Sequence, residues 1–406
     1  MDETVRPKSQ DTCFQKRLIR KGIDMQEQPA HRVFQLSYLR VLVTLLVVAH
    51  HTALAYLSSK PPVDGFTASL AWAAFPIRDA RGWRGFDLFV GANDVFFMAL
   101  MFFVSGLFVW PGLRRHGALA FIGRRFLRLG IPFVIAAGVL APLAYYPAYL
   151  QLGGEARPAS YLHAWFALGK WPAGPAWFLW VLLVFDCIAA MVYLALPKAF
   201  EALARRVRTA ARRPALLFLM LAALSCTAYV PMALHFGGLS WWSSGPFFVQ
   251  SSRPLHYFIY FAMGLCLGAF GTEIPIFERT GRLARRWWLW GLAMLAAFLA
   301  IIGLMLSRKF MAAAAMFSVS CAASSLFVTA VVIRFARQSS WADSLSANAY
   351  GIYLLHYLFV IWIQYAALDW AMPALVKCAV VLIAATGLSW LTTALLRRSK
   401  MIARVV

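Results

Sequence analysis

The sequence predicts an all-α, polytopic membrane protein with about ten transmembrane helices and with both termini in the cytoplasm. Hydrophobic residues make up 62% of the 406 residues and charged residues only 14%. Apolar stretches recur at the length of about 20 residues that an α-helix needs to cross a bilayer. Lys and Arg are concentrated in every second segment between these stretches, the pattern of a chain that crosses a membrane repeatedly.

The predicted spans lie near residues 36–57, 93–113, 129–150, 176–196, 214–235, 254–270, 286–306, 311–334, 347–367 and 373–396. Residues 1–33 come before them, are rich in charged and amide side chains and have no sustained apolar period. We expect them to form a basic cytoplasmic tail that is flexible or only partly helical, without a cleavable signal peptide. Residues 34–400 are predicted to form one transmembrane domain.

The distribution of positive charge predicts the orientation of the chain. With the N-terminus inside, the cytoplasmic segments hold 28 Lys and Arg residues and the outer segments hold nine. This asymmetry favours cytoplasmic termini at both ends and therefore an even number of spans. The formal net charge of +23 then reflects membrane topology. Nucleic-acid binding is not predicted, because the basic residues form short clusters between apolar stretches and no continuous stripe.

The six cysteines are scattered, mostly inside apolar stretches, with no CxxC pair and no spacing typical of metal ligands. We therefore expect free thiols within the membrane domain and predict no metal site.

The first predicted span contains an arginine and a pair of histidines, which is unusual for a helix in a bilayer. Arg40 and His51 share one face of an α-helix, with about 16 Å between them along its axis. Titratable groups in a membrane helix usually face the bundle interior or a hydrated cavity. His51 is a candidate general base for a hydroxyl, although a membrane histidine can also serve only helix packing. His50 points about 100° away, so at most one of the pair faces a given cavity.

Arg124, Arg125 and Arg128 form a basic cluster at the cytoplasmic entry to the third span. Arg125 and Arg128 are three residues apart and should project to one side of a helix, an arrangement suited to phosphate oxygens. The alternative is that these residues contact lipid phosphates, as positive-inside residues often do.

Three further polar residues lie inside predicted spans. Asp186 is the only acidic residue well inside one, so we expect it to face an arginine or a histidine, or to be protonated. His356 is also at mid-span, where it lines a pore or forms a structural hydrogen bond. Ser105 and Gly106 favour close helix packing, and no GxSxG elbow identifies Ser105 as a nucleophile.

The predicted outer segments are rich in tryptophan. Indole faces suit sugar rings, while an interfacial aromatic belt is the alternative explanation. Because several of these residues lie within loops and not at the ends of spans, we favour a role in carbohydrate binding for Trp72, Trp83, Trp165, Trp171, Trp241 and Trp242.

Several of these segments together resemble the membrane-bound acyltransferase 3 family, over residues 35–396. The first span resembles the family's pattern of an arginine, ten residues and a histidine, which selects His51 over His50. The other matching elements are Phe-Phe-x-Ser-Gly at 102–106, Arg-x-x-Arg at 125–128 followed by Pro132, and Ile-Tyr-Leu-Leu-His at 352–356. The segments at 128–132 and 177–180 resemble the branch that succinylates periplasmic glucans.

The resemblance implies an enzyme that moves an acyl group, acetyl or succinyl, from cytoplasmic acyl-CoA to a hydroxyl of an extracytoplasmic carbohydrate. On this hypothesis His51 deprotonates the acceptor, and Arg40 orients the donor or offsets developing negative charge. Arg124, Arg125 and Arg128 would capture the polyanionic coenzyme A, and His50, Ser105, Asp186 and His356 would support the site. We expect the protein in the bacterial inner membrane, with no permanently bound cofactor, with acyl-CoA and a carbohydrate as partners, and with oligomerisation open.

A membrane transporter or a flippase for lipid-linked saccharides is the alternative function. Such proteins also have about ten spans and buried polar residues, but they commonly contain internal repeats with broken helices, and we find no such repeat here. A scaffold without enzymatic activity would leave Arg40 and His51 unexplained.

Overall fold

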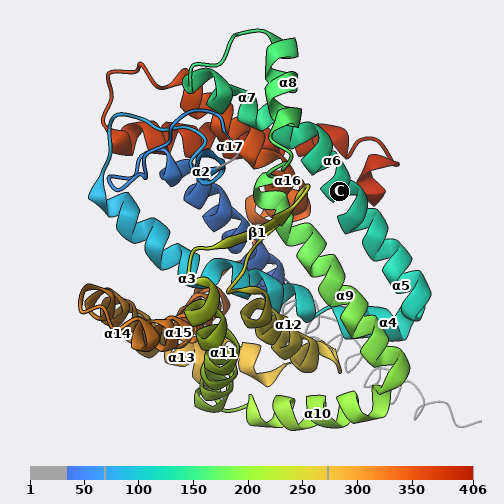
Figure 1. The fold of residues 1–406 in the computed structure, drawn as a ribbon. Helices are drawn as coiled ribbons and strands as arrows, with labels where there is room; N and C mark the ends of the chain where they lie inside the picture. Colours follow the sequence, from blue (N-terminus) through green and yellow to red (C-terminus); the bar gives the residue numbers. More distant parts are fainter. Residues whose placement is uncertain (1–33, 68–69, 272–273, 406) are drawn as a thin grey trace, which may run out of the picture.

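The structure, a computed structural model, describes residues 34–67, 70–271 and 274–405. The predicted tail, residues 1–33, lies outside the described residues. Figure 1 shows a bundle of helices with one short hairpin on the face turned to the viewer. The hairpin pairs β1 (Trp241–Ser244) with β2 (Phe247–Gln250) in antiparallel register.

The prediction of an all-α polytopic bundle is confirmed. Within the described residues, nine helical stretches are long and apolar enough to cross a membrane. They are Phe34–Leu54, Arg84–His116 (α3 and α4), Ala118–Gln151 (α5, η1, α6, η2 and α7), Gly174–Ala195 (η3 and α9), Pro214–Phe236 (α11), Trp287–Leu306 (α14), Phe310–Phe335 (α15), Ser340–Ala366 (α16) and Ala374–Leu396 (α17). The predicted span near 254–270 is the shorter apolar helix α12, Pro254–Gly268, of 15 residues.

Short elements connect these helices. They are α2 (Ala71–Ala74), α8 (Pro158–Ala167), α10 (Pro197–Ala210), η4 (Pro275–Phe277) and α13 (Arg282–Arg285), and a last short element, η5 (Ile402–Arg404), follows α17. Proline stands in the first turn of α8, α10, α11 and α12, where its missing N–H would have no helical partner in any case. These prolines explain why the helices begin where they do.

The first helix, Phe34–Leu54, lies between two apolar cores. Its residues Leu39 and Val43 belong to the larger core, which is built mainly from α3, α9, α11, α12 and α15. Val41 and Val48 belong to the second core, which is built from the following loop, α7, α8, α16 and α17. The helix is therefore packed against both cores along its length.

The first helix and α16 run parallel to each other. At one end the Tyr38 hydroxyl donates to Asp343 Oδ1 at 2.7 Å, and at the other the Gln364 side-chain amide donates to the Thr52 carbonyl at 2.9 Å. The N-terminus of α16 is capped by the Ser339 hydroxyl, which accepts from the Ala342 N–H. These contacts fix the register in which the two helices face each other.

Helices α3 and α12 approach so closely that only glycine fits between them. A Cβ atom on Gly264 would lie 2.1 Å from the Phe103 carbonyl oxygen, and one on Gly106 would lie 2.3 Å from the Phe261 carbonyl oxygen. The expectation that the small residues near position 105 allow close packing is confirmed.

Prolines shape the long helical stretch Ala118–Gln151 and dock it onto α16. Pro132 and Pro147 cannot donate to the carbonyls four residues earlier, those of Arg128 and Leu143. The Tyr350 hydroxyl donates to the Arg128 carbonyl, and the Trp362 indole N–H donates to the Leu143 carbonyl at 2.9 Å. Both donors come from α16, so the carbonyls that the prolines leave free become inter-helix contacts.

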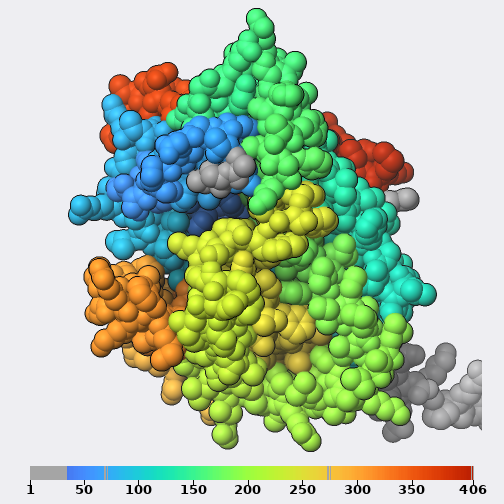
Figure 2. Space-filling view, viewed as in Figure 1, coloured from blue at the N-terminus to red at the C-terminus, as the bar shows by residue number. Residues whose placement is uncertain are grey.

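The loop between the first helix and α3 is folded into a compact layer, which we call the cap segment (residues 55–67 and 70–83). In Figure 2 it lies on the same face as α8 and the hairpin. Its core is formed by its own Trp72 together with Trp165 of α8, and these two residues are 0% and 1% exposed. The expectation that these two indoles present faces to a sugar is therefore wrong for the conformation seen here, because they pack against Phe66, Tyr145 and each other.

A buried ion pair anchors the cap segment to α17. Lys377 Nζ lies 2.6 Å from Asp79 Oδ2, and their side chains are 1% and 2% exposed. Lys377 also donates to the Leu368 carbonyl at 2.8 Å, and the other Asp79 oxygen accepts from the Arg81 N–H. Lys60 donates to the Asp79 carbonyl, and the burial of its ammonium group lowers its pKa.

Candidate active site

His51 and His356 meet between the first helix and α16. His51 Nδ1 lies 2.8 Å from the Val47 carbonyl oxygen, and His356 Nδ1 lies 2.6 Å from the Tyr353 carbonyl oxygen. A carbonyl oxygen only accepts hydrogen bonds, so in the neutral rings both Nδ1 atoms carry the proton. His356 Nε2, at 3.3 Å from His51 Nδ1, is then an additional acceptor for the same N–H.

This arrangement leaves His51 Nε2 unprotonated. No residue in the described part of the chain forms a hydrogen bond with this nitrogen, and the His51 side chain is partly exposed while His356 is fully buried. The lone pair of Nε2 is therefore the basic group that His51 offers to a molecule entering the site. Gln364 donates to the His51 carbonyl at 3.1 Å and holds the helix backbone beside it.

Two tyrosines connect the histidine pair to the cap segment. The Tyr357 ring lies edge-on to His51, with 5.2 Å between ring centroids. Its hydroxyl is 3.0 Å from that of Tyr145, and the Tyr145 hydroxyl donates to the Ala73 carbonyl at 2.9 Å. The same carbonyl lies 3.3 Å from the Tyr357 hydroxyl. The cap segment is thus fastened directly over the histidine pair.

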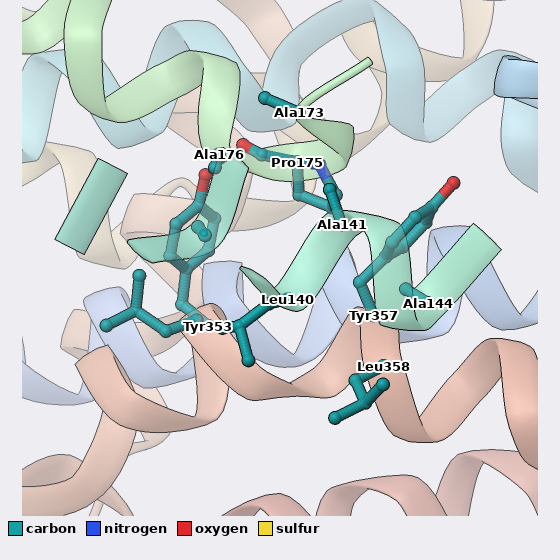
Figure 3. Close-up of a pocket in the computed structure, with 11 residues that line it drawn as sticks. Leu140, Ala141, Ala144, Ala173, Pro175, Ala176, Tyr353, Tyr357 and Leu358 are labelled. Atoms are coloured by element: carbon teal, nitrogen blue, oxygen red, sulfur yellow. Dashed lines mark hydrogen bonds between the residues drawn. The ribbon is translucent and has the colours of Figure 1, made fainter. Parts of the chain in front are cut away.

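Tyr353 and Tyr357, whose rings contact His356 and His51, also line a pocket (Figure 3). Both rings project from α16 toward the segments that carry Pro175 and Ala141. The Tyr353 hydroxyl is bonded to the Pro175 carbonyl. None of the lining residues is charged, and most are small or aliphatic: Ala136, Leu140, Ala141, Ala144, Ala173, Pro175, Ala176, Tyr353, Leu354, Tyr357 and Leu358.

Arg40 does not contact His51, because about three helical turns separate them. Its side chain is exposed and lies within electrostatic range of Arg128, which is also exposed. The contact from Tyr350 to the Arg128 carbonyl fixes the backbone that carries this second guanidinium group. Two cations are therefore held near each other at the end of the first helix remote from the histidines.

The other two arginines of the cluster have partners. Arg125 Nε lies 3.1 Å from Asp186 Oδ2, and the Asp186 side chain is completely buried. Asp186 thus has the arginine partner that its position in a span required. Arg124 contacts His116 at 3.1 Å on the exposed surface. Arg128 lies in the π-helical segment η1 (Phe126–Gly130), which changes the angular relation that an α-helix predicts between Arg125 and Arg128.

His50 faces away from His356. Its ring stacks on Phe97, with centroids 5.0 Å apart, and Asn93 Nδ2 lies 3.4 Å from its Nδ1. The prediction that the two histidines point in different directions agrees with these contacts. Ser105 donates to the Met101 carbonyl of its own helix at 2.9 Å and does not contact the histidine pair.

Sequence reasoning overlooked the tyrosines, Gln364 and the Lys377–Asp79 pair. The signals available were Gln364 and Lys377, which are polar residues inside apolar stretches and therefore needed partners. Among the described residues, no group of three His, Cys, Asp or Glu side chains is placed to hold a metal ion.

Comparison with known proteins adds one finding to this geometry. No curated protein and no solved structure gives a significant match. A family model described as an acyltransferase domain matches residues 33–394, which is nearly the whole chain and includes the first helix, the basic cluster and α16. The chain is thus an integral membrane protein that belongs to the acyltransferase 3 family.

Proposed function

We propose that this protein is an O-acyltransferase that moves a short acyl group from cytoplasmic acyl-CoA to a hydroxyl of an extracytoplasmic carbohydrate. The observation that carries the proposal is the His51–His356 pair, in which both Nδ1 atoms face backbone carbonyls and His51 Nε2 is left as a base. Membership of the acyltransferase 3 family supports the reaction class.

In the proposed reaction, His51 Nε2 takes the proton of the acceptor hydroxyl as its oxygen attacks the thioester carbonyl. The C–S bond breaks as the new ester C–O bond forms, and the proton passes from His51 to the sulfur of the departing coenzyme A. His356 acts as a positioning residue, because its Nε2 accepts a hydrogen bond from His51 Nδ1. This hydrogen bond becomes stronger as the His51 imidazole gains positive charge. No acyl-enzyme is required.

Arg40 and Arg128 would bind the phosphates of coenzyme A. Both side chains are exposed, neither has an acidic partner among the described residues, and their like charges lie within electrostatic range of each other. A polyanion relieves the repulsion between two such guanidinium groups and forms charge-assisted hydrogen bonds with them. The pantetheine arm would then extend from this end of the first helix toward His51.

The pocket of Figure 3 supports acetyl over succinyl as the transferred group. It is uncharged, and the hydroxyls of Tyr353 and Tyr357 are already bonded to Pro175, Tyr145 and Ala73. A succinyl carboxylate in this pocket would be buried without a partner, whereas an acetyl methyl group would contact alanine side chains. An uncharged pocket is therefore not what the narrower resemblance to the glucan-succinylating branch implies.

The charge asymmetry of the connecting segments supports cytoplasmic termini and a place in the bacterial inner membrane. The carbohydrate would approach from the opposite side, where Trp83, Trp241 and Trp242 are 48%, 46% and 50% exposed. These three indoles remain available as sugar contacts, in contrast to the two in the core of the cap segment.

The test uses the purified full chain in lipid nanodiscs, with acyl-labelled acetyl-CoA or succinyl-CoA and a mixture of cell-envelope glycans. We expect ester-linked label from acetyl-CoA to appear at least about tenfold faster than label from succinyl-CoA. Faster transfer from succinyl-CoA would refute the acyl assignment, and no transfer from either thioester would refute the reaction class. Ala144→Leu should slow acetyl transfer by filling the pocket, while Ala144→Gly should not.

A further inference from the structure

A second set of buried polar side chains lies away from the histidine site, between α11, α12 and α15. It consists of Ser225 on α11, His256 and Tyr260 on α12, and Ser318, Cys321 and Ser325 on α15, which we call the polar seam. On α12 and α15 these residues follow one another at helical spacing of three, four or seven, so each of these two helices presents one face. All six side chains are at most 4% exposed.

The polar groups of the seam satisfy one another only in part. The Tyr260 hydroxyl lies beside the Cys321 thiol and the Ser225 hydroxyl, and Cys321 lies beside Ser325. Both ring nitrogens of His256 and the Ser318 hydroxyl have no hydrogen-bond partner among the described residues. Buried polar groups in proteins are nearly always hydrogen-bonded, so these groups require another molecule.

The seam begins at a charged pair that reaches the surface. Arg253 precedes His256 by one turn of α12, and its Nη2 lies 2.5 Å from Asp94 Oδ2. The Arg253 side chain is 3% exposed and the Asp94 side chain 32% exposed, so the pair joins the interior to the exterior. The Arg253 guanidinium also lies over the ring of Phe317, next to Ser318 in the chain.

We infer that the polar seam is a water-binding site, a hydrated path that runs from the Asp94–Arg253 pair to Cys321 and Ser325 in the interior of the bundle. A neutral imidazole needs both a donor and an acceptor as partners, and water supplies both. Direct side-chain bonds between helices, the usual role of buried serines in a membrane protein, leave both nitrogens of His256 and the Ser318 hydroxyl without a partner among the described residues.

The native cysteines report on this inference without any substitution. Cys321 lies in the seam and is 0% exposed, whereas Cys266 lies on α12 outside the seam and is 6% exposed. Static exposure therefore predicts that Cys266 is the more reactive of the two. The thiolate is the form of a cysteine that attacks thiol reagents, and it forms where water reaches the sulfur, so hydration of the seam predicts the opposite order.

The experiment treats the full chain in nanodiscs with methyl methanethiosulfonate and follows each peptide by mass spectrometry. The thiolate attacks the reagent's sulfenyl sulfur and displaces methanesulfinate. The product is a mixed disulfide in which the cysteine carries a methylthio group. We expect Cys321 to react at least about tenfold faster than Cys266. Equal rates, including no reaction at either site, or a faster Cys266 would overturn the inference.

A pair of variants tests the route. Ser318→Leu places an apolar side chain between the Asp94–Arg253 end and Cys321, and it should lower the Cys321 rate to that of Cys266. Val319→Leu, a matched change at the next position outside the seam, should leave the Cys321 rate unchanged. An unchanged rate in Ser318→Leu would refute entry from the Asp94–Arg253 end. The outcome does not depend on acyl transfer, so the proposed function stands or falls separately.

Discussion

The histidine site and the polar seam are both polar regions inside a membrane bundle, but they satisfy their polar groups differently. In the histidine site, the ring nitrogens that face backbone carbonyls, the two tyrosine hydroxyls and the Gln364 amide all have protein partners. In the polar seam, both nitrogens of His256 and the Ser318 hydroxyl have none within the described ranges. The difference separates a preorganised site, with one free basic nitrogen, from a region that needs a mobile solvent.

The comparison also explains why similar residue types take different roles. His51 has its tautomer set by a fixed acceptor, and only then does its second nitrogen become a defined base. His256 has no such acceptor in the described part of the chain, so its tautomer is free to follow the molecules around it. We therefore propose a catalytic role for His51 and a solvating role for His256.

The largest expected effect tests the histidine site. His51→Ala removes the only basic nitrogen that faces outward from the pair, and it should lower acetyl transfer by about 10³-fold, the usual contribution of a general base. His50→Ala, at the adjacent position but directed toward Asn93 and Phe97, should retain transfer within a few-fold. The measurement is the rate of coenzyme A release by the two purified variants. An active His51→Ala protein would refute the assignment of His51 as the general base.

The next effect concerns the anchoring of the cap segment. Lys377→Met leaves the Asp79 carboxylate buried without its cation, so we expect a loss of about 3–5 kcal/mol in the free energy of unfolding. Thermal unfolding in detergent measures the change. The double variant Asp79→Asn/Lys377→Met removes both charges and should recover most of the loss. If the single and double variants are equally unstable, the two side chains stabilise the fold by packing and not by balancing each other's charge.

His356→Ala should have a smaller effect on turnover, because His356 acts on the acyl transfer only through His51. We expect kcat to fall on the order of 10- to 100-fold while KM for acetyl-CoA changes little. His356→Gln keeps a side-chain acceptor and should restore part of the loss. A rise in KM without a change in kcat would assign His356 to donor binding, contrary to the geometry of the pair.

The smallest of the four effects falls on donor affinity. Arg128→Ala should raise KM for acetyl-CoA by about tenfold, which corresponds to the loss of one charge-assisted hydrogen bond, and should leave kcat nearly unchanged. Arg124→Ala, at a surface arginine that already contacts His116, is the matched control and should change KM less. Equal effects of the two substitutions would indicate a diffuse cationic surface and no defined phosphate site.

Some parts of the site were predictable because they depend on local spacing. The common face of Arg40 and His51 and the divergence of His50 follow from the helical repeat alone. The partner of Asp186 was predictable as a type, since a buried carboxylate needs a cation, but the choice of Arg125 required the packing of α5 against α9. The angle between Arg125 and Arg128 around the helix axis was less predictable. The π-helical segment η1 interrupts the α-helical repeat from which that angle follows.

The sequence by itself determined the all-α membrane bundle and the family, and it led to the prediction that the first helix is the place for chemistry. These conclusions rest on composition, on the length of apolar stretches and on short motifs, which are local properties of the chain. Only the tertiary structure decided that His356 is the partner of His51, that Trp72 lies inside a cap and that Lys377 pairs with Asp79. Each of these joins residues separated by tens to hundreds of positions or depends on burial, and helix packing, not local spacing, sets such contacts.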